Sequence, residues 1–328
     1  MNDYIPNLRG RDIVMVSDFI SDSYDEFDKK EEENLLKLIK KDLSVHKIKF
    51  HFVEVKNKKD LHKQISKFDK DKVVIFNWCE AFDEKPNTEY LATKYFDKYG
   101  WIYTGAKTQC LKVSENRNKV YKILKRDKVS VPRQYKLTSN AIKFPIIVKA
   151  AKEHGSFGIT ENSIIERKTQ LEVALTEIKS NKFIGEQFID GPEYTISMWG
   201  PRKHPEILPV FEIKFESNSM QRFKIINYHS KWDRSHPDYL GVHSAKAVKI
   251  DKRLKNAIYK NAKRAYKALN CTGYARLEFR TDKNIPYLTD FNSNPTFRLE
   301  STFIRSAQEG GYSPGNIVAK LCEFALNE

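Results

Sequence analysis

The chain has 328 residues, of which 40% are apolar and 12% aromatic, and its net charge is +15. This length allows two or three domains, and the apolar content excludes wholesale disorder. The sequence shows neither a basic and then apolar leader nor a run of membrane-spanning length, so we expect a cytoplasmic protein without a membrane segment. The four cysteines form no CxxC pair and have no histidine at a zinc spacing, which argues against a disulfide framework and a zinc site.

The positive charge comes mainly from lysine, and it would attract nucleic acid, an acidic membrane surface or polyphosphate ligands. The lysines occur along most of the predicted helices and form no long tract, so a solvated, lysine-biased surface explains them as well. No RNP-type aromatic pattern or helix-turn-helix signature is present, which disfavours nucleic acid as a partner.

Strands alternate with helices through the first hundred residues, which is typical of a parallel α/β sheet. The loop from Asn77 carries Glu80 at the carboxyl end of a strand, where an open sheet presents groups to a substrate. An ordinary loop carboxylate is the simpler interpretation of Glu80. The predicted strands are 13–16, 47–55, 73–76 and 101–103, and the predicted helices are 21–41, 59–68 and 87–99.

Residues 107–128 are predicted to form one helix, and the strand 144–151 that follows carries Lys149 near its end. The next loop, KEHGSFGIT, contains Ser156 and Gly158 and could fold its backbone N–H groups over phosphates. It lacks the GxxxxGK[ST] order of a P-loop, and a plain hairpin turn fits it equally well.

Two further stretches suggest a cleft and its cover. In GEQFIDGPEYTIS, Glu186 and Glu193 flank apolar residues, as where a planar base packs between apolar walls; an amphipathic hairpin with exposed glutamates is the alternative. Residues 217–243 are polar and aromatic-rich with little periodicity and include Lys231, which is typical of a lid.

Two alternating apolar runs around Lys283-Asn284 predict a β-hairpin. Because strand side chains alternate between faces, Glu278, Asp290 and Asn292 should lie on one face of it. Two carboxylates and an amide oxygen suit Mg²⁺. The alternative is a solvated polar face whose carboxylates pair with neighbouring arginines.

These motifs, in this order, resemble the ATP-grasp superfamily, and within it the D-alanine–D-alanine ligase branch. Asn118-Lys119 stands where the family has Asp-Lys, and Lys149 matches the lysine of the family's VKP, with Gly158 nine positions later. GEQFIDGPE resembles the family's hinge, ARLEFR its ARVDF, and DFNSNPT its ExNTxPG. The resemblance covers roughly residues 101–328.

The resemblance implies a chain of mixed α/β and α+β class with an ATP-grasp fold. An N-terminal parallel α/β (pre-ATP-grasp) domain would span residues 1–108. The small lobe of the ATP-grasp would span 109–190, and the C-terminal lobe with the metal-binding hairpin 191–328.

The same resemblance implies that ATP is held between the two lobes. Lys119 and Lys149 would bind the α- and β-phosphates, with the backbone of the Ser156 loop closing over them. The groups that hold adenine and ribose would be Glu186, Gln187, Ile189 and Glu193.

The catalytic end is implied by position as well. Lys231 matches a lid lysine that contacts the γ-phosphate, Arg276 an arginine that stabilises a developing oxyanion, and Ser301 a serine that binds a substrate carboxylate. The ligands of one or two Mg²⁺ ions, or of Mn²⁺ in their place, would be Glu278, Asp290 and Asn292.

The implied activity is ATP-dependent ligation of small-molecule carboxylate and amine substrates, which forms an amide or peptide bond through an acyl phosphate and releases ADP and phosphate. This chemistry needs no covalent nucleophile of the enzyme, and the sequence shows no nucleophile signature. The alternative is a nucleotide-binding scaffold or sensor without catalysis. The resemblance leaves both a monomer and a homodimer open.

The substrate half departs from the family. The GGxSxE segment and the HGxxGE stretch are missing, and Ala150 replaces the proline after Lys149. Thr296 replaces a glycine, and Glu300 replaces the histidine that precedes the serine at 301. We therefore predict that D-alanine is not the substrate.

Overall fold

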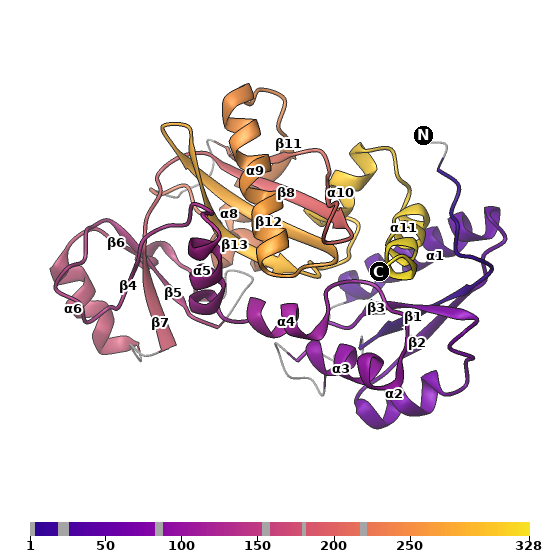
Figure 1. Ribbon diagram of the computed structural model, residues 1–328. Coiled ribbons are helices and arrows are strands. Elements are labelled where there is room, and N and C mark those ends of the chain that lie inside the picture. Colours follow the sequence, from indigo (N-terminus) through magenta and orange to yellow (C-terminus); the bar gives the residue numbers. More distant parts are fainter. Residues whose placement is uncertain (1–3, 19–25, 83–87, 153–157, 179–181, 217–221) are drawn as a thin grey trace.

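The computed structural model describes residues 4–18, 26–82, 88–152, 158–178, 182–216 and 222–328. Three β-sheets follow one another along the chain, each with helices packed on it (Figure 1). None of the helices in these ranges is long and apolar enough to cross a membrane.

The first sheet is parallel, as predicted, with the strand order β2-β1-β3. Its strands are β1 (Asp12–Ser17), β2 (Phe50–Glu54) and β3 (Val73–Trp78). Helices α2 (Lys58–Ile65) and α3 (Tyr90–Tyr99) cover one face, and α1 (Glu26–Val45) covers the other.

The last helix of the chain, α11 (Pro314–Leu326), also belongs to this first layer. It packs against α1 and β3 (Figure 1). Its apolar residues are buried nearly all round, as expected of a helix enclosed on several sides. The two ends of the chain therefore share one apolar core.

The single helix predicted for residues 107–128 is wrong: the segment forms α4 (Thr108–Ser114) and α5 (Arg117–Arg126). The break is at Asn116, whose backbone is extended and whose side chain accepts a hydrogen bond from the N–H of Lys119. Asparagine is a favoured N-cap because it satisfies such an orphan donor. A new helix therefore starts at Arg117.

The second sheet is small and antiparallel, with the order β4-β7-β5-β6. Its inner strands pair Ile147 with Glu186, so Lys149, two residues further along, lies on the same face as Glu186. A short 3₁₀ turn (Glu161–Ser163) precedes β6, and α6 (Lys168–Glu177) packs on the sheet. The strands are β4 (Gln134–Tyr135), β5 (Ile146–Ala150), β6 (Ile164–Ile165) and β7 (Phe183–Gln187).

The third sheet has six strands in the order β11-β10-β8-β12-β13, with β9 paired to β8. The predicted hairpin is confirmed as β12 (Gly273–Asp282) and β13 (Ile285–Ser293). Its turn residues Lys283 and Asn284 have φ of 44° and 68°, the left-handed conformation that tight hairpin turns require. The other strands are β8 (Glu193–Gly200), β9 (Glu206–Ile207), β10 (Phe211–Phe215) and β11 (Val242–Lys246).

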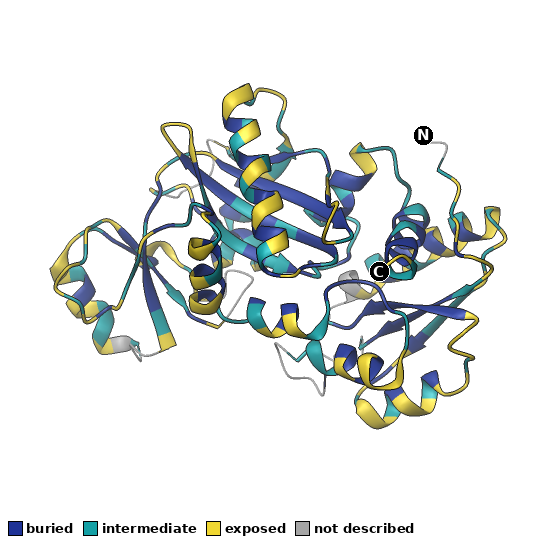
Figure 2. Ribbon diagram, viewed as in Figure 1, coloured by how far each residue is buried: buried dark blue, intermediate teal, exposed yellow. Residues whose placement is uncertain are grey.

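The two faces of the hairpin differ in polarity. Leu277, Phe279 and Phe291 point into a core shared with α4, α5 and α9 (Lys252–Ala268). The opposite face carries the charged side chains. Figure 2 shows the buried strands beneath the exposed outer surfaces of the helices.

Three short helices complete the third layer. The region with little predicted periodicity contains α7 (Tyr228–Trp232) and α8 (Pro237–Gly241), and α10 (Thr302–Glu309) follows the hairpin. Proline at the first position of α8 suits a helix start, since its missing N–H would have no intrahelical partner there.

Candidate active site

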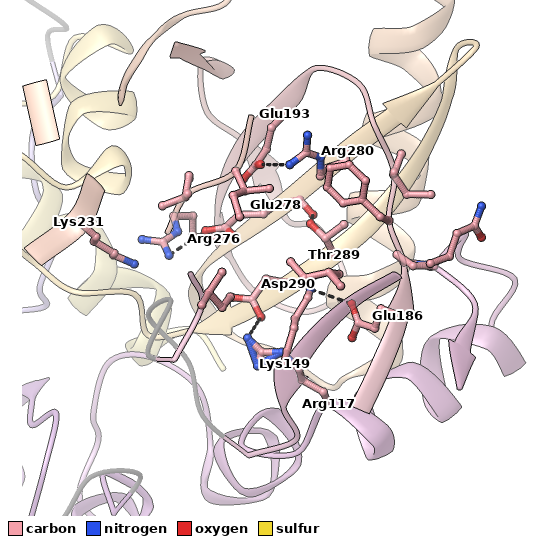
Figure 3. Close-up of a pocket in the computed structure, with 18 residues that line it drawn as sticks. Arg117, Lys149, Glu186, Glu193, Lys231, Arg276, Glu278, Arg280, Thr289 and Asp290 are labelled. Atoms are coloured by element: carbon pink, nitrogen blue, oxygen red, sulfur yellow. Dashed lines mark hydrogen bonds and ion pairs between the residues drawn. The ribbon is translucent and has the colours of Figure 1, made fainter. Parts of the chain in front are cut away.

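A pocket lies between the small sheet and the polar face of the hairpin (Figure 3). Strands β5 and β7 contribute one wall, β8, β12 and β13 the other, and α5 and α7 each send a cation into it. The lining residues on which the chemistry depends are Arg117, Lys149, Glu186, Gln187, Phe188, Ile189, Glu193, Lys231, Arg276, Glu278, Arg280 and Asp290.

Four carboxylates line this pocket, and each forms an ion pair with a cation that also lines it. All eight side chains are largely removed from water, so the partners neutralise each other where the charges would otherwise be costly. Lys231 is a fifth lining cation. The pairs are Lys149–Glu186 at 2.7 Å, Arg276–Glu278 at 3.0 Å, Arg117–Asp290 at 3.2 Å and Arg280–Glu193 at 3.3 Å.

Lys119, expected at the phosphates, is exposed on the outer side of α5 and does not line the pocket. Arg117, two residues earlier, lines the pocket instead: only 6% of it is exposed, and its guanidinium faces Asp290. The pKa of Arg117 is raised, because the attraction of Asp290 and Glu186 outweighs the cost of burial. Because Asn116 caps α5, the helix begins at Arg117, and Arg117 faces the pocket while Lys119 faces solvent.

The end of the pocket nearest the small sheet is apolar with one buried carboxylate. Glu186 is completely buried; its Oε2 accepts hydrogen bonds from Lys149 and from the Tyr121 hydroxyl at 3.2 Å. Its Oε1 has no hydrogen-bond partner among the described residues. Phe188 packs against Phe223 and Ile225 to form a wall next to Gln187 and Ile189.

Glu193 lies where β8 enters the pocket, and only 7% of it is exposed. Burial raises the pKa of Glu193 to about 7, against the opposing effect of Arg280. Arg280 also donates to the carbonyl oxygen of Gly191. A Cβ at Gly191 would lie 1.8 Å from the carbonyl oxygen of Thr281, so only glycine fits this close approach.

The metal-type residues occupy neighbouring positions of the hairpin. Glu278 lies opposite Asp290, and Arg276 lies opposite Asn292. Glu278 and Asp290 line the pocket, whereas Asn292, two pairs further along, does not. Within the described ranges, no group of three or more His, Cys, Asp or Glu side chains could hold a metal. Two carboxylates suit Mg²⁺, which is commonly bound by one or two of them together with substrate phosphates and water.

Lys231 reaches the pocket from α7, on the side of Arg276 (Figure 3). Burial lowers the pKa of Lys231, and the neighbouring Arg276 lowers it further. The N–H of Tyr228 donates to the carbonyl oxygen of Ile159 at 2.9 Å, which joins α7 to the segment that follows the glycine loop. Asn227 caps α7 and also donates to Asp238, which holds α7 against α8.

Ser301, like Lys119 and Asn292, does not line the pocket. Ser301 is the N-cap of α10, where its hydroxyl oxygen accepts a hydrogen bond from the N–H of Ile304 at 3.4 Å. It lies beyond the hairpin and does not line the cavity. Ser156 falls outside the described residues.

A second group of carboxylates lies at the carboxyl edge of the first sheet. Asp18, after β1, accepts hydrogen bonds from the N–H of Glu80, after β3, at 2.9 and 3.1 Å. Burial raises the pKa of Glu80 to about 7, while Arg298 and a hydrogen bond from Thr296 act against the rise. Thr296 and Arg298, in the loop that follows the hairpin, therefore lie next to Glu80 at the carboxyl edge of the first sheet, where we expected groups that face a substrate.

Sequence reasoning missed Arg117 and Arg280 as pocket residues, and Tyr121 as a hydrogen-bond partner of Glu186. Arg280 could have been found, because it alternates with Arg276 and Glu278 on the same face of β12. Tyr121 gave no signal, since an aromatic residue within a helix is most simply a core residue.

The sequence profile described as "D-ala D-ala ligase C-terminus" matches residues 116–323, which is more than half of the chain. The chain belongs to this family. That membership confirms the predicted ATP-grasp fold of the D-alanine–D-alanine ligase branch, and it places the chain among ATP-dependent, ADP-forming carbon–nitrogen ligases.

Individual relatives agree with the family. The D-alanine–D-alanine ligase of Desulforudis audaxviator (strain MP104C) is 26% identical over 239 residues, covering 69% of this chain and 73% of the relative. The crystal structure of a Bacillus anthracis D-alanine–D-alanine ligase complexed with ATP has a TM-score of 0.71 at 18% identity and covers 97% of this chain and 98% of that one. The VanG D-Ala:D-Ser ligase of Enterococcus faecalis has a TM-score of 0.68 at 18% identity, with 96% and 99% covered.

Proposed function

We propose that the protein joins a small-molecule carboxylate to an amine through an acyl phosphate at the expense of ATP. The observation that carries this proposal is the convergence of Arg117, Lys149, Lys231 and Arg276 around the paired carboxylates Glu278 and Asp290. A site for phosphoryl transfer needs cations and metal-binding oxygens held ready in a protected cleft, because the reaction gathers negative charge.

The chemistry explains why both kinds of group are needed. An oxygen of the carboxylate attacks the γ-phosphorus of ATP; the new C–O–P linkage forms as the bond to the β-phosphate oxygen breaks, and ADP leaves. The amine then attacks the acyl carbon, gives a tetrahedral oxyanion and expels phosphate while the nitrogen loses a proton. Arg276 would stabilise this oxyanion.

The residues of the pocket divide between the two ends of ATP. Glu186 and the backbone from Gln187 to Ile189 would hold adenine, and Glu193 would accept the ribose hydroxyl protons. Arg117, in place of Lys119, and Lys149 would bind the α- and β-phosphates. Lys231 would contact the γ-phosphate from the lid.

The residues present fit the magnesium ions that phosphoryl transfer uses. Glu278 and Asp290 would hold the metal, with Asn292 reaching it only if the hairpin or a side chain adjusts on binding. Bound there, Mg²⁺ would neutralise charge on the phosphate oxygens. Arg117 and Arg276, which now face these carboxylates, would then be available to phosphate and to the oxyanion.

The substrates that we propose are amino acids or peptide-like molecules other than D-alanine. The relatives are named for D-alanine and D-serine substrates. In this chain, the residues that differ from the family, Thr296 and Glu300 among them, lie in the loop next to Glu80 and Arg298. Ser301, at the start of α10, would offer its hydroxyl and the N-terminal N–H groups of the helix to a substrate carboxylate.

The test is phosphate release from Mg·ATP in the presence of pools of amino acids. We expect release with at least one pool, loss of it in Lys149→Ala and Asp290→Ala, and full activity in the control Lys119→Ala. A protein that binds ATP but releases no phosphate with any pool would instead be the scaffold or sensor considered above.

A further inference from the structure

The charge of +15 is distributed unevenly along the chain. Residues 1–108 contain 20 Lys and Arg and 20 Asp and Glu, so the N-terminal α/β part contributes no net charge. The whole excess of positive charge therefore lies in residues 109–328. Lysines that seem dispersed in the sequence are concentrated by the fold.

Two helices, α5 and α9, carry much of this excess, and neither contains an Asp or a Glu. Every exposed position on them is Lys, Arg or Asn, and none is apolar. We call these positions the α5–α9 face. It consists of Asn118, Lys119, Lys122, Lys125 and Arg126 on α5, and of Lys252, Arg253, Asn256, Lys260, Lys263, Arg264 and Lys267 on α9.

The two helices are neighbours on one side of the molecule. Val120 and Leu124 of α5 share a core with Ile258 and Ala262 of α9, against the apolar side of the hairpin. Their outer surfaces are both exposed in the view of Figure 2. The α5–α9 face therefore lies on the apolar side of the hairpin, and the pocket lies on its polar side.

Little counter-charge is present on this face. Among the described residues, no cation of α9 forms an ion pair, and of the exposed cations of α5 only Arg126 does, with the adjacent Asp127. Like charges one helical turn apart repel each other and destabilise the helix. A bound ligand with many negative charges would relieve this repulsion.

We propose that the α5–α9 face binds the phosphate backbone of double-stranded nucleic acid without reading its sequence. Helix α9 has 17 residues and is about 25 Å long, while a duplex offers one negative charge for about every 1.7 Å of its axis. Rows of Lys and Arg are typical of contacts to phosphate oxygens, which carry no sequence information.

The exposed residues argue against other polyanions. A helix that lies in a membrane surface presents Trp, Phe or Leu to the lipid, and this face has no exposed apolar side chain. Protein interfaces are enriched in aromatic residues and depleted of lysine. Single strands need aromatic platforms for their bases, which are also missing from the exposed positions.

The test measures fluorescence anisotropy of a labelled 20-base-pair duplex with the full-length protein at several salt concentrations. The variant Lys260→Glu/Lys263→Glu/Lys267→Glu reverses the charge at three positions of the α5–α9 face. The control Lys37→Glu/Lys40→Glu/Lys41→Glu changes three exposed lysines of α1 and gives the same net charge. ATP binding, measured in parallel, reports whether each variant is folded, because the pocket is on the other side of the hairpin.

For the wild type, we expect the logarithm of the binding constant to fall steeply with the logarithm of salt concentration. The α9 variant should bind at least tenfold more weakly, with a slope shallower by about 0.9 for each phosphate that it no longer neutralises. The control should stay within about threefold of the wild type on the same electrostatic grounds.

Three results would overturn the proposal. Equal reductions in the α9 variant and in the control would mean that net charge alone attracts the duplex. Affinity that does not change with salt would exclude phosphate contacts. Tighter binding to phosphatidylserine vesicles or to polyglutamate than to the duplex would assign the face to a membrane or to an acidic protein.

Discussion

Arg117, at the first turn of α5, faces Asp290 on β13 with 3.2 Å between Nη2 and Oδ1, and both side chains are largely buried. This ion pair joins the helix that follows α4 to the strand that carries the metal-type carboxylates. It also holds Asp290 toward the pocket. The pair places the cation that we propose for phosphate binding in direct contact with a carboxylate that we propose as a metal ligand.

Replacing Arg117 by alanine should destabilise the protein and weaken ATP binding. Loss of one partner of a buried ion pair costs about 3 kcal/mol or more, because the remaining charge stays in a poorly solvated place. Urea unfolding and ATP titration measure the two effects. Arg117→Lys should restore part of both, since it retains the charge but not the forked geometry.

Lys119→Ala is the matched control for this prediction. Lys119 is exposed on the same helix, two residues away, and its replacement should change the unfolding free energy by less than about 0.5 kcal/mol. Equal losses for both variants would show that α5 tolerates no substitution, and would remove the special role given to Arg117.

The choice between Lys119 and Arg117 shows where the sequence stops being sufficient. The hairpin could be predicted because its alternation and its Lys283-Asn284 turn are local signals. The break before α5 could not, since Glu115 and Asn116 are acceptable inside a helix as well as at a cap. A helix start displaced by a few residues changes which side chain faces inward.

The sequence is also insufficient to show which motif residues at the two ends of the pocket line it. Glu186 and Glu193 were found because a short turn fixes their spacing. Asn292 and Ser301 belong to the matching motif, but the sequence does not tell how far along the hairpin the cavity extends. Residues that act across sheets, such as Glu80 and Arg298, depend on the packing of distant segments.

Tyr121→Phe should lower stability and raise the KM for ATP. The Tyr121 hydroxyl lies 3.2 Å from Glu186 Oε2 and 3.1 Å from the carbonyl oxygen of Thr289, so it connects the small sheet with the hairpin. It has one proton and can donate fully to only one acceptor at a time. A hydrogen bond to a charged group is worth about 1.5–3 kcal/mol.

Thermal unfolding and the KM for ATP measure the effect of Tyr121→Phe. Phenylalanine preserves the packing, so a loss of stability reports the hydroxyl and not a cavity. Tyr103→Phe is a suitable control, because the Tyr103 hydroxyl donates to Asp97 far from the pocket. An unchanged KM for ATP in Tyr121→Phe, together with lowered stability, would limit Tyr121 to a structural role.

Glu193 should make the folded protein less stable as pH rises from about 4.5 to about 7. Its pKa is raised by burial from 4.5 to about 7 in the folded state, so the folded protein binds more protons than the unfolded chain in this range. The stability that Glu193 contributes is therefore fully present below its pKa in the unfolded chain. It is lost as pH rises through its pKa in the folded protein.

Glu193→Gln should remove this part of the pH dependence. The difference in unfolding free energy between the wild type and the variant should change with pH between about 4.5 and 7, and it should be constant outside that range. Urea unfolding at a series of pH values measures it. Asp18 and Glu80 also titrate here, so only the difference is informative. A constant difference throughout would contradict the raised pKa of Glu193.

Glu80→Gln should affect the substrate and not ATP. Burial raises the pKa of Glu80 to about 7, and its Oε1 has no hydrogen-bond partner within the described part of the chain. Once ionised, this carboxylate can hold an ammonium group of a substrate next to Arg298 and Thr296. We therefore expect kcat/KM for the substrate to increase as pH passes about 7 in the wild type.

In Glu80→Gln this increase should be absent, with kcat/KM for the substrate at least tenfold lower at pH 8, because the charge-assisted hydrogen bond is removed. The KM for ATP should stay within about twofold, since Glu80 does not line the nucleotide pocket. Steady-state phosphate release, with each substrate varied in turn, separates the two constants. A rise in the KM for ATP as large as the loss for the substrate would show that the substitution disturbs the whole cleft, and that Glu80 does not select the substrate.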